Sequence, residues 1–182
     1  MVKLEPTTPL QGATPVEVGT MVVQEVGDLG PVTSIAPYPG RQKAVSDLLK
    51  KAHGITFPKP NMFLPGKEAS CLWFGRDMAL LIGAEPDPAL AKEAALTDQS
   101  DAWAVLSLRG EGIEAALARL CPIDTRLRQF PINSTARTEV AHMTSSLTRM
   151  SETEFQLMIF RAFARTALHE ITDAMEGVAA RG

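Results

Sequence analysis

The side chains with the greatest potential for acid–base, nucleophilic or metal chemistry are three histidines and two cysteines. They are His53, His142 and His169, with Cys71 and Cys121. A metal site needs several such ligands at short spacing or on one helix face, and no two of these residues are spaced in that way. Two cysteines also cannot build the disulfide framework of a small secreted domain. We therefore expect no catalytic or metal-binding residue among them.

Each of these residues has a structural role that its neighbours favour. His53 follows Lys50 and Lys51 at the end of a predicted helix, where a cation interacts favourably with the helix dipole. His142 alternates with its neighbours in a predicted strand, which favours a packed or edge position. His169 falls on the polar side of the last predicted helix and is expected to be exposed. Both cysteines lie among apolar residues, as buried and inert thiols do.

Two further patterns could support binding or catalysis. Gly110, Glu111 and Gly112 follow a strand and open a helix, which is the place of a phosphate-binding turn, but the third glycine is missing. Asp98 and Asp101 flank a serine before a strand, either as a carboxylate pair or as a polar turn. No G-x-S-x-G elbow of a serine hydrolase occurs. The sequence predicts no catalytic, cofactor-binding or metal-binding residue.

The strongest positive signal is a run of large apolar side chains in a predicted loop. Residues 57–66 include Phe57, Met62, Phe63 and Leu64 together with three prolines. Loops lie at the surface, so such side chains need something to cover them. They either fold back onto their own domain or dock on another chain, and the sequence leaves both open.

Composition and charge are those of an ordinary globular protein. The 182 residues are 45% hydrophobic and 21% charged, with a formal net charge of −3, which gives no field for nucleic acid or an anionic membrane. The N-terminus lacks the apolar core of a signal peptide, and no run is long enough to cross a bilayer. We expect a cytoplasmic protein without nucleic-acid or membrane partners.

Hydrophobic periodicity predicts an α+β fold in which one unit is duplicated. The order strand, helix, strand, strand, helix occurs over residues 33–96 and again over 101–175. We expect a sheet-and-helix sandwich. Its predicted parts are an extended N-terminal arm at 1–15 with little to bury and a single domain at 16–182, whose repeats cover about 32–97 and 98–176.

The predicted elements follow apolar stripes and turn residues. In the first half they are strands at 16–26 and 32–36, a helix at 41–52, a hairpin at 70–74 and 78–82, and a helix at 89–96. In the second half they are a strand at 102–108, a helix at 113–120, a hairpin of strands at 137–149 and 153–160, and a helix at 162–175. The strand at 102–108 is apolar on both faces, which predicts a central position.

Several stretches taken together resemble the gamma subunit of heterotetrameric sarcosine oxidase, a relative of the folate-binding aminomethyltransferase fold. The similarity runs in one order from about residue 58 to residue 174. Its main motifs are Leu72-Trp73-Phe74-Gly75-Arg76-Asp77, residues 97–106, Cys121-Pro122-Ile123-Asp124, Arg137-Thr138, Ala141-His142 and residues 161–165.

The resemblance implies a non-catalytic assembly subunit. Such a complex oxidises sarcosine to glycine and hydrogen peroxide, and the methyl carbon leaves as formaldehyde or as 5,10-methylenetetrahydrofolate. It implies alpha, beta and delta subunits as partners, and FAD, FMN, NAD, tetrahydrofolate and zinc held by those subunits, with none on this chain. The alternatives are an accessory subunit of a related N-methyl amine oxidase and a stand-alone folate-binding protein. Against the latter, the chain lacks a third module and the acidic motif of the aminomethyltransferases.

Overall fold

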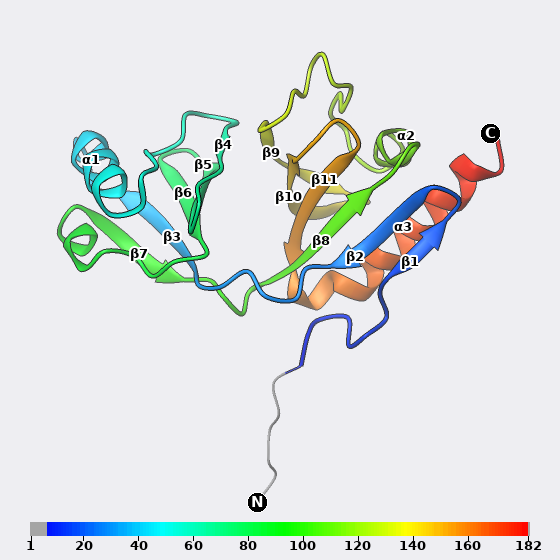
Figure 1. The fold of residues 1–182 in the computed structure, drawn as a ribbon, viewed down its shortest axis with the longest axis horizontal. Coiled ribbons are helices and arrows are strands. Elements are labelled where there is room, and N and C mark those ends of the chain that lie inside the picture. The colour runs from blue at the N-terminus through cyan, green and yellow to red at the C-terminus, as the bar shows by residue number, and fades with distance from the viewer. Residues whose placement is uncertain (1–6, 182) are drawn as a thin grey trace, which may run out of the picture.

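The computed structural model describes residues 7–181, which form two antiparallel sheets set side by side (Figure 1). The larger sheet has the strand order β1-β2-β8-β11-β10-β9. Its strands are β1 (Val16–Val18), β2 (Met21–Glu25), β8 (Trp103–Arg109), β9 (Thr135–Val140), β10 (Met143–Arg149) and β11 (Glu154–Phe160). The helices α2 (Ile113–Leu117) and α3 (Ala164–Ala179) pack on one face of it, and a short 3-10 turn η2 (Arg161–Phe163) precedes α3.

The smaller sheet has the order β4-β5-β6-β3-β7. Its strands are β3 (Val32–Pro37), β4 (Phe63–Leu64), β5 (Ser70–Gly75), β6 (Met78–Ile82) and β7 (Ala94–Asp98). One helix, α1 (Gln42–His53), covers its outer face by burying Val45 and Leu49. The 3-10 helix η1 (Pro88–Lys92) leads into β7. This α1 agrees with the predicted helix, and Gly54 closes it in the left-handed conformation.

Strand alternation divides the interior into three apolar clusters. In β6, Ala79 and Leu81 face α1, whereas Leu80 and Ile82 face the other sheet. In β8, the even-numbered residues 104, 106 and 108 face α2 and α3, whereas Trp103 faces the smaller sheet. Both sheets are apolar on both faces. Each sheet therefore packs against helices with one face and against the second sheet with its opposite face.

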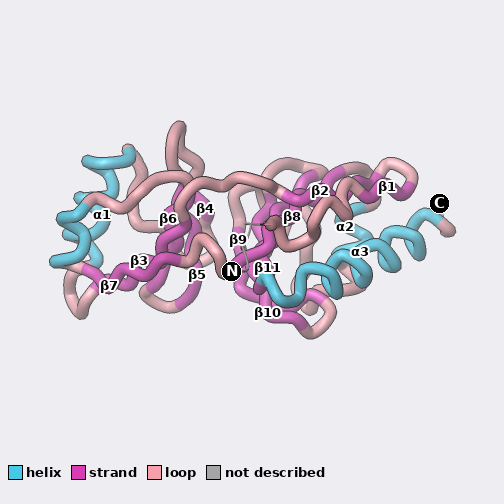
Figure 2. The backbone as a smooth tube through the Cα atoms, turned by 90° about the horizontal axis from the view of Figure 1, so that it is seen from below, coloured by secondary structure: helices cyan, strands magenta, loops and turns pink. Residues whose placement is uncertain are grey.

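The contact between the two sheets is called the seam below. Its buried members are Val32, Phe63, Leu72, Leu80, Ile82, Trp103, Val105 and Met158. In the view at right angles, β4 and β5 lie beside β9 in the middle of the molecule (Figure 2). Because the seam draws on both halves, we propose that residues 16–182 form the single domain expected from the sequence.

The two halves repeat one strand arrangement, with one exchange. In the smaller sheet β3 lies between β6 and β7, and in the larger sheet β8 lies between β11 and β2. The place that β7 fills in the first half is therefore filled in the second half by β2, which comes from the N-terminal end of the chain. The hairpin partner of β2, β1, has no counterpart in the smaller sheet.

The predicted helix at 89–96 is wrong. Asp87 does cap a first turn, because its carboxylate accepts a hydrogen bond from Ala89 N at 2.8 Å, and Pro88 follows it. The turn ends at Lys92, however, and Ala94–Asp98 forms the strand β7 along β3. Backbone pairing with an open sheet edge outweighed the helix propensity of these alanines and Leu96.

The predicted strands at 16–26 and 137–149 are each two strands. The first turns at Gly19 and Thr20 to give β1 and β2. The second turns at Ala141 and His142, both with positive φ, to give β9 and β10. A two-residue hairpin turn requires this backbone conformation and normally takes Gly or Asn, so Ala141 and His142 do not indicate a turn by their residue types.

The predicted arm at 1–15 is corrected for its described part, and residues 1–6 lie outside the described residues. Leu10 is only 1% exposed and packs in the core under α3. Its backbone N donates to the Glu25 carboxylate at 3.0 Å. The buried leucine, this hydrogen bond and a bond of 3.0 Å from Arg165 Nη2 to Gln11 Oε1 hold this segment against the larger sheet and α3. Within residues 7–181, no helix is long and apolar enough to cross a membrane.

We expect Gly110→Ala to destabilise the protein. Gly110 has φ +111°, and an added Cβ would overlap the carbonyl oxygen of Thr20 in the β1–β2 turn. Left-handed backbone strain of about 1–2 kcal/mol adds to overpacking of about 1–3 kcal/mol. Urea unfolding should therefore show a free energy of unfolding that is lower by roughly 2–5 kcal/mol.

Gly12→Ala is the matched control, because Gly12 has φ +83° but open space around the added Cβ. Its free energy of unfolding should fall only by the added backbone strain, about 1–2 kcal/mol. Equal losses in the two variants would contradict the close approach at Thr20.

Candidate functional site

The apolar loop at 57–66 packs mainly onto its own protein. Phe63 pairs with Leu72 through β4 and is only 6% exposed, at the seam. Phe57 packs partly against the cluster under α1. Met62 is the member that stays open, with 39% of its surface exposed. Of the two readings left open by the sequence, folding back therefore describes the aromatic members.

This loop also ties the two halves together through its backbone. Phe63 N donates to Asn133 O at 2.8 Å, and Thr135 N donates to Asn61 O at 3.0 Å. A bridge between Met62 and Ser134 joins the two segments in the middle. The edges of the two sheets are thus joined at the beginning of β9, which places Met62 beside the loop that precedes that strand.

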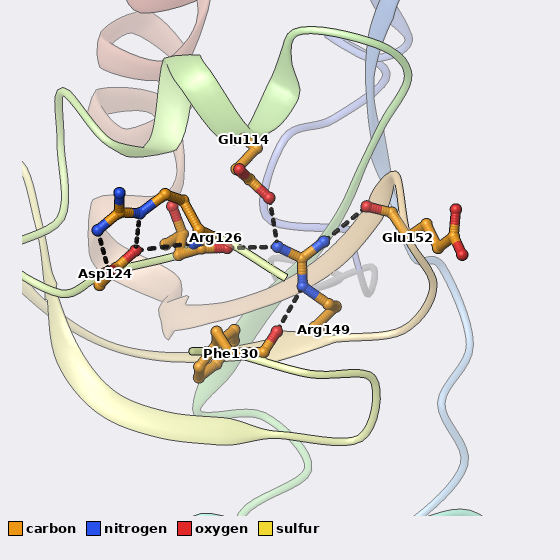
Figure 3. Close-up of polar contacts among 7 residues, drawn as sticks. Glu114, Asp124, Arg126, Phe130, Arg149 and Glu152 are labelled. Carbon is orange, nitrogen blue, oxygen red and sulfur yellow. Dashed lines mark hydrogen bonds and ion pairs between the residues drawn. The ribbon is translucent and has the colours of Figure 1, made fainter. Parts of the chain in front are cut away.

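One charged side chain, Arg149, is completely buried at the end of β10 (Figure 3). Its Nε donates to Phe130 O at 2.7 Å, and Nη1 donates to Glu152 O at 2.6 Å. Nη2 donates to the Glu114 carboxylate at 2.6 Å and to Thr125 O. The guanidinium carbon also lies 4.2 Å from the centre of the Phe155 ring.

These bonds give Arg149 a structural role. Two of its acceptors are backbone carbonyls in the loop at 121–134, which has no strand of its own to hold it. A planar guanidinium can bind several acceptors at once, so one side chain fixes that loop, the start of α2 and the β10–β11 turn. The loop in turn presents Leu127 and Ile132, which are 41% and 45% exposed.

A row of aromatic rings crosses the seam. Phe74 of β5 meets Trp103 of β8 edge to face at 5.2 Å between ring centres, and Trp103 stacks on Phe160 of β11 at 4.6 Å. The Arg137 guanidinium lies 4.1 Å from the centre of the Phe74 ring and 5.7 Å from that of Trp103. Trp103 is 7% exposed, whereas Phe160 is 41% exposed.

Two donors in this row lack acceptors among the described residues. Trp103 Nε1 and Arg137 Nη1 are buried without a hydrogen-bond partner. Partial burial lowers the pKa of the Arg137 guanidinium, with desolvation as the cause. Arg137 is part of one motif of the sequence resemblance, and neither Arg137 nor Arg149 has an individual role predicted from the sequence. Their partners come from distant segments, so the only local signal is that each arginine lies within a predicted strand.

The histidines are dispersed. His53 closes the last turn of α1, as predicted. His142 is exposed in the β9–β10 turn and not packed within a strand, which corrects that expectation because the chain reverses there. His169 is exposed on α3, as predicted, with Nδ1 3.6 Å from the Asp173 carboxylate. Residues 7–181 contain no cluster of three His, Cys, Asp or Glu side chains able to hold a metal.

The glycine turn and the acidic turn both have structural partners. Thr20 Oγ1 donates to Glu111 O at 2.9 Å, so the β1–β2 turn sits against the glycine turn where a phosphate would otherwise approach. Asp98 accepts from the Ser100 backbone N at 2.9 Å and from its Oγ at 2.7 Å, which lowers the Asp98 pKa. Ser100 Oγ in turn accepts from Val32 N at 3.1 Å.

The surface cavities are modest in size and mixed in polarity. One of about 310 Å³ lies beside the seam and is lined by Glu25, Asp28, Asp101 and Arg161 among others. Another of about 480 Å³ lies at the β9–β10 turn next to His142. Neither combines an apolar interior with convergent donors, which is the usual form of a small-molecule site.

Comparison with known proteins shows that the chain is similar to a subunit of sarcosine oxidase. No family model matches it. The curated gamma subunit of sarcosine oxidase from Corynebacterium sp. strain U-96 is 29% identical over 113 residues, which is 57% of this chain and 55% of that relative. The aligned part therefore spans about half the length of the curated relative.

The whole fold is similar to a chain in a solved complex. Heterotetrameric sarcosine oxidase from Corynebacterium sp. U-96, in complex with pyrrole 2-carboxylate, contains a chain that matches with TM-score 0.79 and 23% identity over 96% of both chains. The chain resembles the sarcosine oxidase gamma subunit. That resemblance, predicted from the sequence, is confirmed by the curated relative.

The fold prediction is also confirmed. Glycine cleavage system aminomethyltransferase T from Bartonella henselae matches with TM-score 0.58 and 14% identity over 84% of this chain and 45% of that protein. At this identity the likeness concerns the fold. The α+β architecture with similarity to the aminomethyltransferases agrees with the duplicated pattern in the sequence.

We expect Arg149→Met to destabilise the protein by about 3–5 kcal/mol. The methionine fills part of the volume but leaves the carbonyls of Thr125, Phe130 and Glu152 without their donor. The measurement is urea unfolding followed by circular dichroism. Arg126→Met is the control, because Arg126 is exposed and binds only Asp124 in this region, and it should change little. Matching stabilities for the two variants would exclude the structural role of Arg149.

We expect both cysteines to resist alkylation in the folded protein at pH 8. Burial raises the pKa of Cys71 and of Cys121 to about 12, so the reactive thiolate is scarce. Mass spectrometry after iodoacetamide treatment should find both thiols unmodified until urea unfolds the chain. Lys67→Cys adds an exposed thiol as an internal control. Labelling of either native cysteine as fast as that thiol would contradict the prediction.

Proposed function

We propose that this chain is the gamma subunit of a heterotetrameric sarcosine oxidase and acts there as an assembly and stabilising subunit. The observation that carries the proposal is the match over 96% of both chains to a chain of the Corynebacterium complex. The similarity to the curated gamma subunit supports the same assignment. The partners in this proposal are the alpha, beta and delta subunits.

In the proposed complex, sarcosine, oxygen and water give glycine, formaldehyde and hydrogen peroxide. With tetrahydrofolate as acceptor, the one-carbon unit leaves as 5,10-methylenetetrahydrofolate. We assign FAD, FMN, NAD, tetrahydrofolate and zinc to the other subunits and no catalytic, cofactor-binding or metal-binding residue to this chain. We also assign the complex to the cytoplasm.

The chemistry of the described residues supports a scaffold role. The two thiols are buried with pKa values of about 12, and the three histidines lie on different elements and form no metal-binding cluster within residues 7–181. The surface instead exposes large apolar side chains, namely Leu127, Ile132, Phe160 and Phe163 in addition to Met62. A chain that binds a larger partner through such side chains stabilises the assembled state by mass action.

The test is co-expression with the alpha, beta and delta subunits. We expect one co-eluting complex with sarcosine-dependent hydrogen peroxide production, while the purified lone chain shows no flavin absorbance and no sarcosine turnover. Persistent separate elution, or turnover by the lone chain, would overturn the proposal.

Titration of the lone chain with tetrahydrofolate and assay of the complex with other N-methyl amines separate the two alternatives. Binding of tetrahydrofolate by the lone chain would favour a stand-alone folate-binding protein. Turnover of other N-methyl amines without turnover of sarcosine would favour an accessory subunit of a related oxidase.

A further inference from the structure

The aromatic row at the seam combines exposed apolar surface with a positive charge that has no ion-pair partner in the part of the chain that the structure describes. Arg137 belongs to β9, yet none of the ion pairs found among residues 7–181 includes it. Its Nη1 is buried without an acceptor. The rings of Phe74 and Trp103 compensate part of the desolvation through the cation–π contact, but they leave the in-plane N–H donors unused.

The neighbouring rings make this a place for association. Phe160 is stacked on buried Trp103 but keeps 41% of its own surface exposed, and Phe163, three residues further on, is 44% exposed. Aromatic residues and arginine, held in place by buried neighbours, are the types that carry most binding energy in protein interfaces. Trp103 and Arg137 are held by strands from both sheets, so little side-chain freedom remains to be lost on binding.

We propose that this aromatic row binds a segment of a larger subunit that presents a carboxylate to Arg137 and an apolar side chain to Phe160. The proposal rests on the proposed function. A carboxylate fits because Arg137 is only partly buried, so guanidinium N–H groups other than the buried Nη1 can donate to it, and because it supplies a counter-charge. A protein segment fits better than a small molecule, because neither Arg137 nor Phe74 lines the cavities described above.

Although β9 is an edge strand, backbone contacts on two sides hold it and its arginine in a fixed orientation. Ser146 on β10 pairs with Arg137, and the Met62–Ser134 bridge holds the preceding residues against the smaller sheet. The guanidinium is therefore supported from two directions before any partner arrives. A preorganised charge of this kind mainly slows dissociation of the correct partner.

The experiment measures binding of the full chain to an immobilised alpha–beta–delta complex. Arg137→Gln and Phe160→Ala should each raise the Kd at least about tenfold. Arg137→Lys keeps the charge but loses the bidentate and stacked geometry, so it should weaken binding by a smaller factor. The matched controls are Arg41→Gln and Tyr38→Ala, which change an exposed arginine and an exposed aromatic ring near the start of α1, outside the row.

The outcomes separate this proposal from the function on which it rests. Failure of the wild-type chain to bind the complex would count against the subunit assignment itself. Wild-type binding with unchanged Kd for the folded Arg137→Gln and Phe160→Ala variants would overturn only the docking site. Unchanged assembly with a lost yield of 5,10-methylenetetrahydrofolate would assign Arg137 to a small molecule and would also overturn it. Thermal unfolding of each variant checks that the fold is retained.

Discussion

The apolar seam between the two sheets is the constraint on which the rest of the structure depends. Each sheet alone would leave one apolar face in water after its helices are packed, because β6, β8 and β11 carry apolar residues on both faces. Joining these faces buries Leu80 and Val105 together and brings Phe74, Trp103 and Arg137 into one row. The same junction fixes the loop that carries Met62. The candidate interaction surface is thus a by-product of how the two halves close.

Local signals predicted the elements whose ends carry clear capping or turn residues. The helix α1 ends at Gly54, and the β5–β6 hairpin turns where Gly75 and Asp77 permit it, so both agreed with the sequence. The prediction at 89–96 is wrong because Asp87 and Pro88 indicate only where a first turn begins, while the open edge of β3 decides the state of the residues that follow. The turn at Ala141 and His142 was missed because its residues are not those that such turns favour.

The candidate site was harder to foresee than the fold. Arg149 binds Glu114, Thr125, Phe130 and Glu152, and no local pattern predicts four partners spread over three segments. The apolar loop at 57–66 was a correct place to look, yet the side chain that it leaves open is Met62 rather than the buried Phe63. A linear sequence shows which residues are unusual for a loop, but burial is decided by the neighbours that folding supplies.

In the larger sheet β2 occupies the place beside β8 that β7 occupies beside β3 in the smaller sheet. This arrangement has a consequence for biosynthesis. Val22 pairs with Arg109, so the β1–β2 hairpin, which precedes the whole smaller sheet in the chain, has no permanent place until β8 is made. The N-terminal hairpin must wait, with its edge unpaired, while the entire first half is synthesised. Proteolytic nicking between β7 and β8 would not yield two autonomous halves, because the second would lack an edge strand. Transferring the β1–β2 hairpin behind α3 by circular permutation is the rearrangement that would make the duplication contiguous.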